Sequence, residues 1–184
     1  MSFFNWPAEE ALPSRRAQQH RRRVVLDLLD KFGRQFPEIT YELLWESGTI
    51  NSQAWRLGSA RYVRVYGGLV RHPKMTRPGL ALMLAHETGH HLGGPPEDPH
   101  MPWISWQGQA DYWAASVGMK EVFGLHARNM TVRGARQICE LQKAFSGDEP
   151  DLSSECRHKT FIAGASASAM PDCTQKAFEK FCND

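Results

Sequence analysis

Hydrophobic and polar residues in the first part of the chain follow two different periods. Between Ser14 and Gly33, apolar residues recur at the spacing of one helix face, which predicts a helix over residues 14–34 with Ser14 as its cap. Over residues 39–70 the period is closer to two, and glycines separate the short segments ITYELLW, QAWRLG and RYVRVYGGLV. This second pattern predicts a small twisted sheet of three or four strands with an exposed edge strand.

A longer apolar run, LALMLAHETGHHLGG at residues 80–94, predicts a buried helix beside that sheet. Thr76 and Pro78 form a start signal for it, because a hydroxyl residue followed by proline is typical of a helix N-terminus. Gly93 and Gly94 form the corresponding end signal. We expect this helix to lie in the core and to organise the rest of the fold.

The second half of the chain predicts more helices than strands. Prolines favour a loop directly after the central helix, apolar spacing favours two helices further on, and the C-terminal part is rich in loop-forming residues before a last short helix. The fold class is therefore α+β, with the whole chain, residues 1–184, forming one domain. The expected loop covers residues 94–104, and the three expected helices cover residues 105–123, 132–145 and 175–181.

The central helix carries a pattern with specific chemistry. His86, Glu87 and His90 fit H-E-x-x-H, in which the two histidines project from one helix face about one turn apart and reach a single zinc ion. Glu87 is then placed to take a proton from a water molecule on the metal. An ordinary core helix with incidental polar residues is the alternative. It requires three ligating or ionisable groups to be buried without partners, which is costly.

Composition and charge exclude several classes of function. A net charge of +2 gives no reason to expect nucleic acid as a partner, and the basic residues near residue 20 suit a solvated helix face. No apolar run reaches the ~18 to 20 residues that a membrane span needs. The first residues lack the basic-then-apolar order of a signal peptide. We therefore expect a chain without a membrane span and without nucleic acid as a partner.

Four cysteines lie in the last quarter of the chain, and they define a subregion over residues 139–184. An even number of cysteines in a compact region predicts two disulfides, for which three pairings are possible, with free buried thiols as the alternative. Disulfides would indicate a periplasmic or secreted location. The cysteines are Cys139, Cys156, Cys173 and Cys182.

A catalytic zinc usually takes three protein ligands, so a third is needed. His91 is turned about 100° from His90 around the helix, which points it away from the pair. His100 follows within range, but it lies in a loop whose direction the sequence does not set. The stronger candidates are Gln107 and Asp111, four residues apart on the helix predicted over residues 105–123.

At Gln107-Gly108-Gln109-Ala110-Asp111 the chain resembles the gluzincin zinc peptidases, whose second helix carries E-x-x-x-D, often as E-x-x-A-D. The resemblance covers residues 50–120, includes Asn51-Ser52-Gln53-Ala54 before a strand, and is closest to small minigluzincin-like proteins. It implies a zincin-like fold in which the first position binds zinc and the aspartate orients the first histidine. Here the expected glutamate is glutamine.

Three arrangements follow from that difference. Gln107 binds zinc while Asp111 holds His86, or Asp111 is itself the ligand, or the site is a weakened relative. The first two predict a zinc-dependent metallopeptidase in which Glu87 activates water. The third predicts a module that binds peptides or proteins without cutting them. An extended peptide can pair with the exposed edge strand in either case.

Overall fold

The first helix begins where the sequence predicts. The computed structural model describes residues 4–5, 13–145 and 152–182, and it is a mixed α+β structure. Helix α1 (Arg15–Gln35) is capped by Ser14, whose hydroxyl accepts a hydrogen bond from the Ala17 amide at 3.3 Å. One face of the helix is buried and packs on the sheet and on the central helix. That face consists of Val25, Leu28, Leu29 and Phe32.

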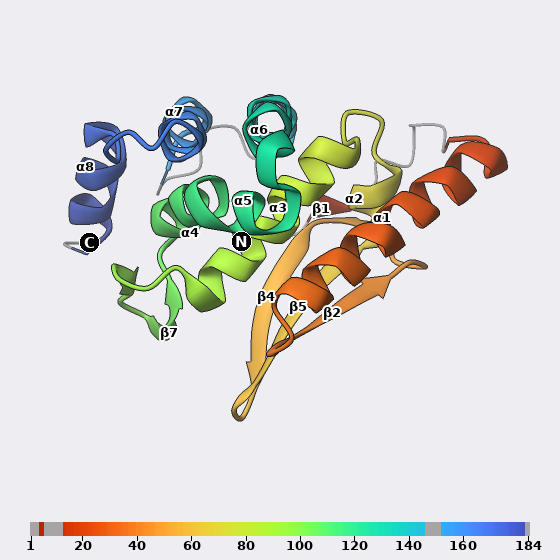
Figure 1. Ribbon diagram of the computed structural model, residues 1–184, viewed down its shortest axis with the longest axis horizontal. Coiled ribbons are helices and arrows are strands. Elements are labelled where there is room, and N and C mark those ends of the chain that lie inside the picture. Colours follow the sequence, from red (N-terminus) through yellow and green to blue (C-terminus); the bar gives the residue numbers. More distant parts are fainter. Residues whose placement is uncertain (1–3, 6–12, 146–151, 183–184) are drawn as a thin grey trace.

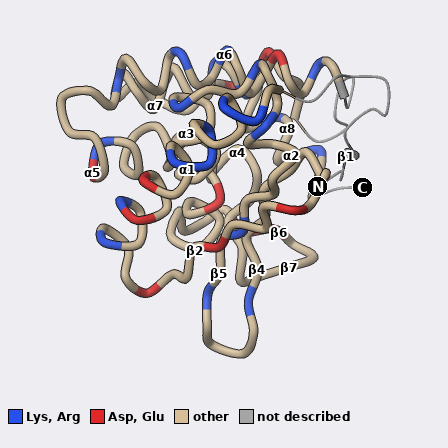
Figure 2. The backbone as a smooth tube through the Cα atoms, turned by 90° about the vertical axis from the view of Figure 1, so that its right-hand side faces the viewer, with Lys and Arg blue, Asp and Glu red and all other residues tan. Residues whose placement is uncertain are grey.

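Three strands form the sheet that the period-two segment predicts. β2 (Ile39–Leu44), β4 (Ser52–Leu57) and β5 (Ala60–Tyr66) lie in the order β2-β5-β4, with β2 parallel and β4 antiparallel to β5. β4 is thus an edge strand, and its hairpin with β5 projects from the rest of the molecule, with basic positions on both strands (Figure 2). A short strand, β3 (Thr49–Ile50), pairs instead with β1 (Phe4–Asn5).

The sequence predicts a strand that continues to residue 70, and this prediction is wrong at its end, because β5 stops at Tyr66. Gly67–Arg71 forms a short helix, α2, instead. A Cβ atom on Gly67 would overlap the carbonyl of Trp45, and one on Gly68 would overlap the carbonyl of Gly48. The two glycines are therefore required for close backbone packing rather than for a turn between strands.

Helix α3 (Arg77–Leu92) runs through the middle of the molecule, with the sheet and α1 on one side and α6 on the other (Figure 1). Burial of most of its residues confirms the core helix. Thr76 is the N-cap residue, as predicted, but its hydroxyl bonds the side chain of Gln137 instead of capping the helix. The helix begins at Arg77, three residues before the apolar run.

After α3 the chain departs in part from the predicted loop. β6 (Glu97–Asp98) and β7 (Met101–Ser105) form a small antiparallel hairpin there. The helix predicted over residues 105–123 is present as α4 (Gln107–Trp113), a π-helical segment η1 (Ala114–Gly118) and α5 (Met119–Phe123).

The last third of the described chain contains more helix than the sequence predicts. A 3₁₀ turn, η2 (Gly124–His126), leads into α6 (Ala127–Phe145), which starts five residues before the predicted helix. α7 (Ser154–Ala165) lies in the segment expected to be loop, and α8 (Asp172–Phe181) is the last helix. α7 was missed because small and polar residues interrupt its apolar face. Residues 146–151 of the expected loop lie outside the described residues.

Only one of the two expected disulfides is present among the four cysteines. Cys156 on α7 bonds to Cys173 on α8, while Cys139 is a buried free thiol and Cys182 an exposed one. Burial raises the pKa of the Cys139 thiol to about 11, so it stays protonated at neutral pH. No described helix is both long enough and apolar enough to cross a membrane.

Removing the Cys156–Cys173 disulfide should lower the free energy of unfolding by about 3 kcal/mol, because the bond closes a loop with a sequence separation of 17 residues. We would measure urea denaturation of a Cys156→Ala/Cys173→Ala variant. Cys182→Ala is the matched control, since it removes an exposed free thiol and should stay within about 0.5 kcal/mol of wild type. Equal unfolding curves for the two variants would contradict a stabilising role for the bond.

Candidate metal centre

Two histidines face each other on α3. The ring centroids of His86 and His90 are 4.5 Å apart, and the residues are only 1% and 3% exposed. Their four-residue spacing places them on one side of the helix, as predicted. The rest of the helix around them is apolar or packed, so these rings lie in the core of the protein and not on its surface.

The Nδ1 atom of each ring lies close to an oxygen atom, as an ion-pair contact for His86 and as a hydrogen bond for His90. His86 Nδ1 lies 2.8 Å from Asp111 Oδ1, and His90 Nδ1 lies 2.8 Å from the carbonyl oxygen of Ser105. A carbonyl oxygen only accepts, so Nδ1 of His90 carries the proton and its Nε2 has a free lone pair. That Nε2 is buried and has no hydrogen-bond partner among the described residues. Burial holds the pKa of His90 well below its ordinary value, which keeps the imidazole neutral.

Glu87 is anchored by the edge strand. The hydroxyl of Ser52, the first residue of β4, donates a 2.8 Å hydrogen bond to Glu87 Oε1. The second carboxylate oxygen, Oε2, is buried without a hydrogen-bond partner within the described part of the chain. Burial raises the pKa of Glu87 above its ordinary value, although nearby His86 and the Ser52 hydrogen bond oppose the shift. A carboxylate with a raised pKa is suited to accept a proton near neutral pH.

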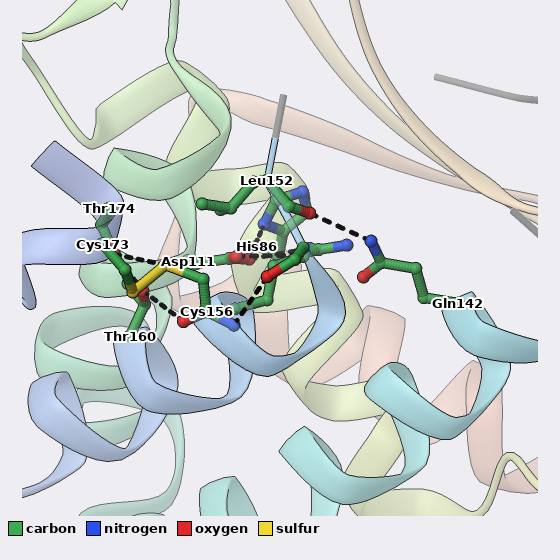
Figure 3. Close-up of polar contacts among 10 residues, drawn as sticks. His86, Asp111, Gln142, Leu152, Cys156, Thr160, Cys173 and Thr174 are labelled. Carbon is green, nitrogen blue, oxygen red and sulfur yellow. Dashed lines mark hydrogen bonds and ion pairs between the residues drawn. A yellow bond between two sulfur atoms is a disulfide. The ribbon is translucent and has the colours of Figure 1, made fainter. Parts of the chain in front are cut away.

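Asp111 is held from two sides at the back of the histidine pair. Arg157 on α7 donates from Nε to Oδ2 and from Nη2 to Oδ1, both at 2.8 Å. His86 contacts Oδ1 of the same carboxylate (Figure 3). Burial alone would raise the pKa of Asp111, but the charge and hydrogen bonds of Arg157 bring it below its ordinary value. Asp111 is therefore ionised, and its Oδ1 atom contacts the His86 ring.

Gln107 is the first residue of α4 and is half-buried. Within the described residues, no three side chains of His, Cys, Asp or Glu come together so as to hold a metal ion. The Asp111 oxygens already accept hydrogen bonds from Arg157. Among the predicted ligands, the structure thus brings together His86 and His90, with Asp111 behind them.

The other histidines considered from the sequence do not join this pair. His91 donates from Nε2 to the carbonyl of Tyr62 at 2.9 Å and stacks on Trp103. His100 is exposed, and its ring lies edge-on to Phe181. Both residues therefore have structural contacts of their own.

Two residues of the site were not expected from the sequence. Ser52 belongs to a segment that was noted only for its resemblance to an edge-strand motif. Arg157 lies 46 residues after Asp111 in a segment expected to be loop, so no local pattern connects the two. The only sequence-level signal for Arg157 is that a buried carboxylate needs a cationic or hydrogen-bonding partner.

Comparison of the chain with protein-family models, with curated proteins and with solved structures finds no match. The arguments for function therefore rest on the site itself. That site is a buried pair of histidines on one helix, with the Glu87 carboxylate next to His86 in the chain and the buried Asp111–Arg157 pair in contact with His86.

Proposed function

We propose that this protein is a zinc-dependent metallopeptidase in which His86 and His90 hold the metal and Glu87 is the general base. The observation that carries the proposal is the arrangement of the two imidazoles. Each Nδ1 is occupied by a carboxylate or a carbonyl, which leaves Nε2 for a metal, and Nε2 of His90 is buried without a partner in the described chain. This is the usual way in which proteins prepare histidines for metal binding.

The donor set fits zinc, with the unusual feature that the third ligand, Gln107, is a neutral amide. Neutral imidazoles are preferred zinc ligands, and the low pKa of His90 favours that state. The contacts of Asp111 with Arg157 and His86 support its role as an orienting residue, which leaves the Gln107 amide oxygen as the third protein ligand. When bound, zinc supplies Lewis-acid polarisation of the scissile carbonyl and activation of water.

The chain's own residues account for the remaining steps. Glu87 accepts a proton at Oε2 and returns it to the leaving amine, while Ser52 keeps the carboxylate in place through Oε1. β4 is an edge strand fixed to α3 by this same hydrogen bond. A peptide that pairs with β4 as an added strand therefore runs past Glu87, which supports a peptide or protein substrate.

The zincin-like fold and the gluzincin relationship are part of this proposal. A three-stranded sheet with a free edge beside the H-E-x-x-H helix, followed by a helix with Gln107 and Asp111, supports them. The Cys156–Cys173 disulfide supports an oxidising location, the periplasm or the cell exterior.

A module that binds peptides without cutting them is the second candidate. The observation in its favour is the neutral Gln107 at the third ligand position, together with the lack of a third His, Cys, Asp or Glu beside the histidines in the described residues. A weakly held metal would leave the edge strand able to bind peptide while hydrolysis is slow.

Metal analysis with a cleavage assay tests the proposal. Wild-type protein should bind about one zinc per chain and cleave a denatured protein, with both properties lost on chelation. His90→Ala should weaken zinc binding by more than about a hundredfold. His91→Ala is the matched control on the same helix and should keep the metal. If the wild type fails to bind zinc, or both variants bind it equally, the metal site is refuted.

Replacing Gln107 with glutamate should tighten zinc binding by about ten- to hundredfold, because a charged ligand replaces a neutral one. Competition with a chromogenic chelator measures this change. The matched control is Gln109→Glu, since the side chain of Gln109 instead donates to the carbonyl of Gly93. Unchanged zinc affinity in Gln107→Glu would favour Asp111 as the third ligand.

A further inference from the structure

A cavity of about 570 Å³ lies between α1, the start of α3 and the start of α6. It shares no lining residue with the candidate metal centre. Its volume falls within the ~300 to 1,000 Å³ that is typical of small-molecule sites. The cavity therefore has the size of a binding site for a small molecule, and it is independent of the proposed hydrolysis.

The inner surface of the cavity is apolar. Among the residues that line it, Met75 and Leu80 are buried, while Val24 and Met130 are half-buried. None of these side chains offers a strong hydrogen-bond donor or acceptor. Two of the four are methionines, whose flexible side chains adapt to hydrocarbon groups of different shape. The body of a ligand in this cavity is thus expected to be hydrocarbon.

The rim of the cavity is basic. Arg21, Arg77 and Arg133 line it together with His20 and His126, and the lining within the described chain contains no aspartate or glutamate. Such a rim attracts a negative group and repels a positive one. An apolar interior with a cationic mouth is complementary to a molecule with a hydrocarbon body and an anionic end.

The three arginines differ in the hydrogen bonds and ion pairs that they already make. Arg21 donates from Nη1 to the carbonyls of Val70, His72 and Met75. Arg77 pairs with Asp27. Arg133 on α6 is exposed, and it lines the cavity together with the exposed His126. Arg133 is therefore the cation that a ligand would reach with least disturbance of existing contacts.

We propose that this cavity binds an anionic amphiphile, with its negative group at Arg133 and its hydrocarbon chain against Met75, Leu80 and Met130. A carboxylate carried on an alkyl chain has this chemistry. The inference does not depend on zinc or on peptide hydrolysis, so either proposal can fail without the other.

The test uses decanoate as the probe and the methionine methyl groups as reporters. In protein labelled with ¹³C at methionine methyls, decanoate should shift the signals of Met75 and Met130 in a saturable way. The signal of Met101, which is exposed on β7 away from the cavity, should stay in place. Decyltrimethylammonium, which has the same chain and the opposite charge, should leave all three signals unchanged. Equal shifts with both amphiphiles would overturn the proposal, as would the absence of shifts with decanoate.

A pair of variants on α6 tests the role of the rim. Arg133→Gln should weaken decanoate binding by about two- to fivefold, the loss expected for one solvent-exposed ion pair. Arg136→Gln is the matched control, because Arg136 is also exposed on α6 but does not line the cavity. Circular dichroism of each variant establishes that the fold is kept. Equal weakening in the two variants, or none in either, would contradict the assigned position of the negative group.

Discussion

Replacing Glu87 with glutamine should lower the rate of peptide hydrolysis by about 10²- to 10⁴-fold, the usual contribution of a general base. Glutamine keeps the size of the side chain and an oxygen that accepts from Ser52, but it cannot take up a proton at neutral pH. Zinc content should be unchanged, because Glu87 is not one of the proposed ligands. Initial rates on a denatured protein substrate, measured at equal zinc loading, give the comparison.

The control for this experiment is Glu97→Gln, which neutralises an exposed carboxylate on β6 in the hairpin that follows α3. It should cleave at the wild-type rate. If Glu87→Gln and wild type bind zinc and hydrolyse the substrate equally, Glu87 is not the base. If both bind zinc and neither hydrolyses, the binding module becomes the better account of the protein.

The sequence was sufficient for the elements that depend on local spacing. The face formed by Val25, Leu28 and Phe32 predicts α1, and the apolar run around His86 and His90 predicts the core helix. In both cases the information lies within a few turns of helix, where side-chain positions follow from the helical period. The mixed α+β class follows from the same local patterns.

The features that the sequence did not supply depend on contacts between distant segments. The number of cysteines does not determine which thiols come within bonding distance. One of the two expected disulfides is absent, and Cys139 is a buried free thiol. α2 replaces a strand end because Gly67 and Gly68 pack against another segment's backbone. Local composition predicts neither event.

In the candidate site, too, local patterns predict some residues, and contacts between distant segments bring in the others. His86, Glu87 and His90 follow from a five-residue pattern, and Asp111 from a resemblance at fixed spacing. Ser52 and Arg157 reach the site from β4 and α7, and only the tertiary structure brings them there. A buried aspartate implies that some partner exists, but the identity of that partner is a property of the fold.

Removing either member of the Asp111–Arg157 pair should lower the free energy of unfolding by roughly 3 to 5 kcal/mol, because the remaining buried side chain would lose a charged partner that two hydrogen bonds join to it. Both residues are almost fully buried, and two hydrogen bonds of 2.8 Å join them. Urea denaturation of Asp111→Asn and Arg157→Met measures the two effects. The slope against urea should stay near the wild-type value if each variant unfolds in two states.

The double variant measures the interaction energy between Asp111 and Arg157, apart from the contacts that each residue makes with others. Asp111→Asn/Arg157→Met leaves neither charge buried, so its loss should fall short of the sum of the two single losses by about 0.5 to 3 kcal/mol. The matched control is Asp27–Arg77, an ion pair with side chains 46% and 39% exposed, whose disruption should cost under about 1 kcal/mol. Strict additivity at Asp111 and Arg157 would mean that the two side chains act independently. The link from α7 through Asp111 to the ring of His86 would then have no energetic basis.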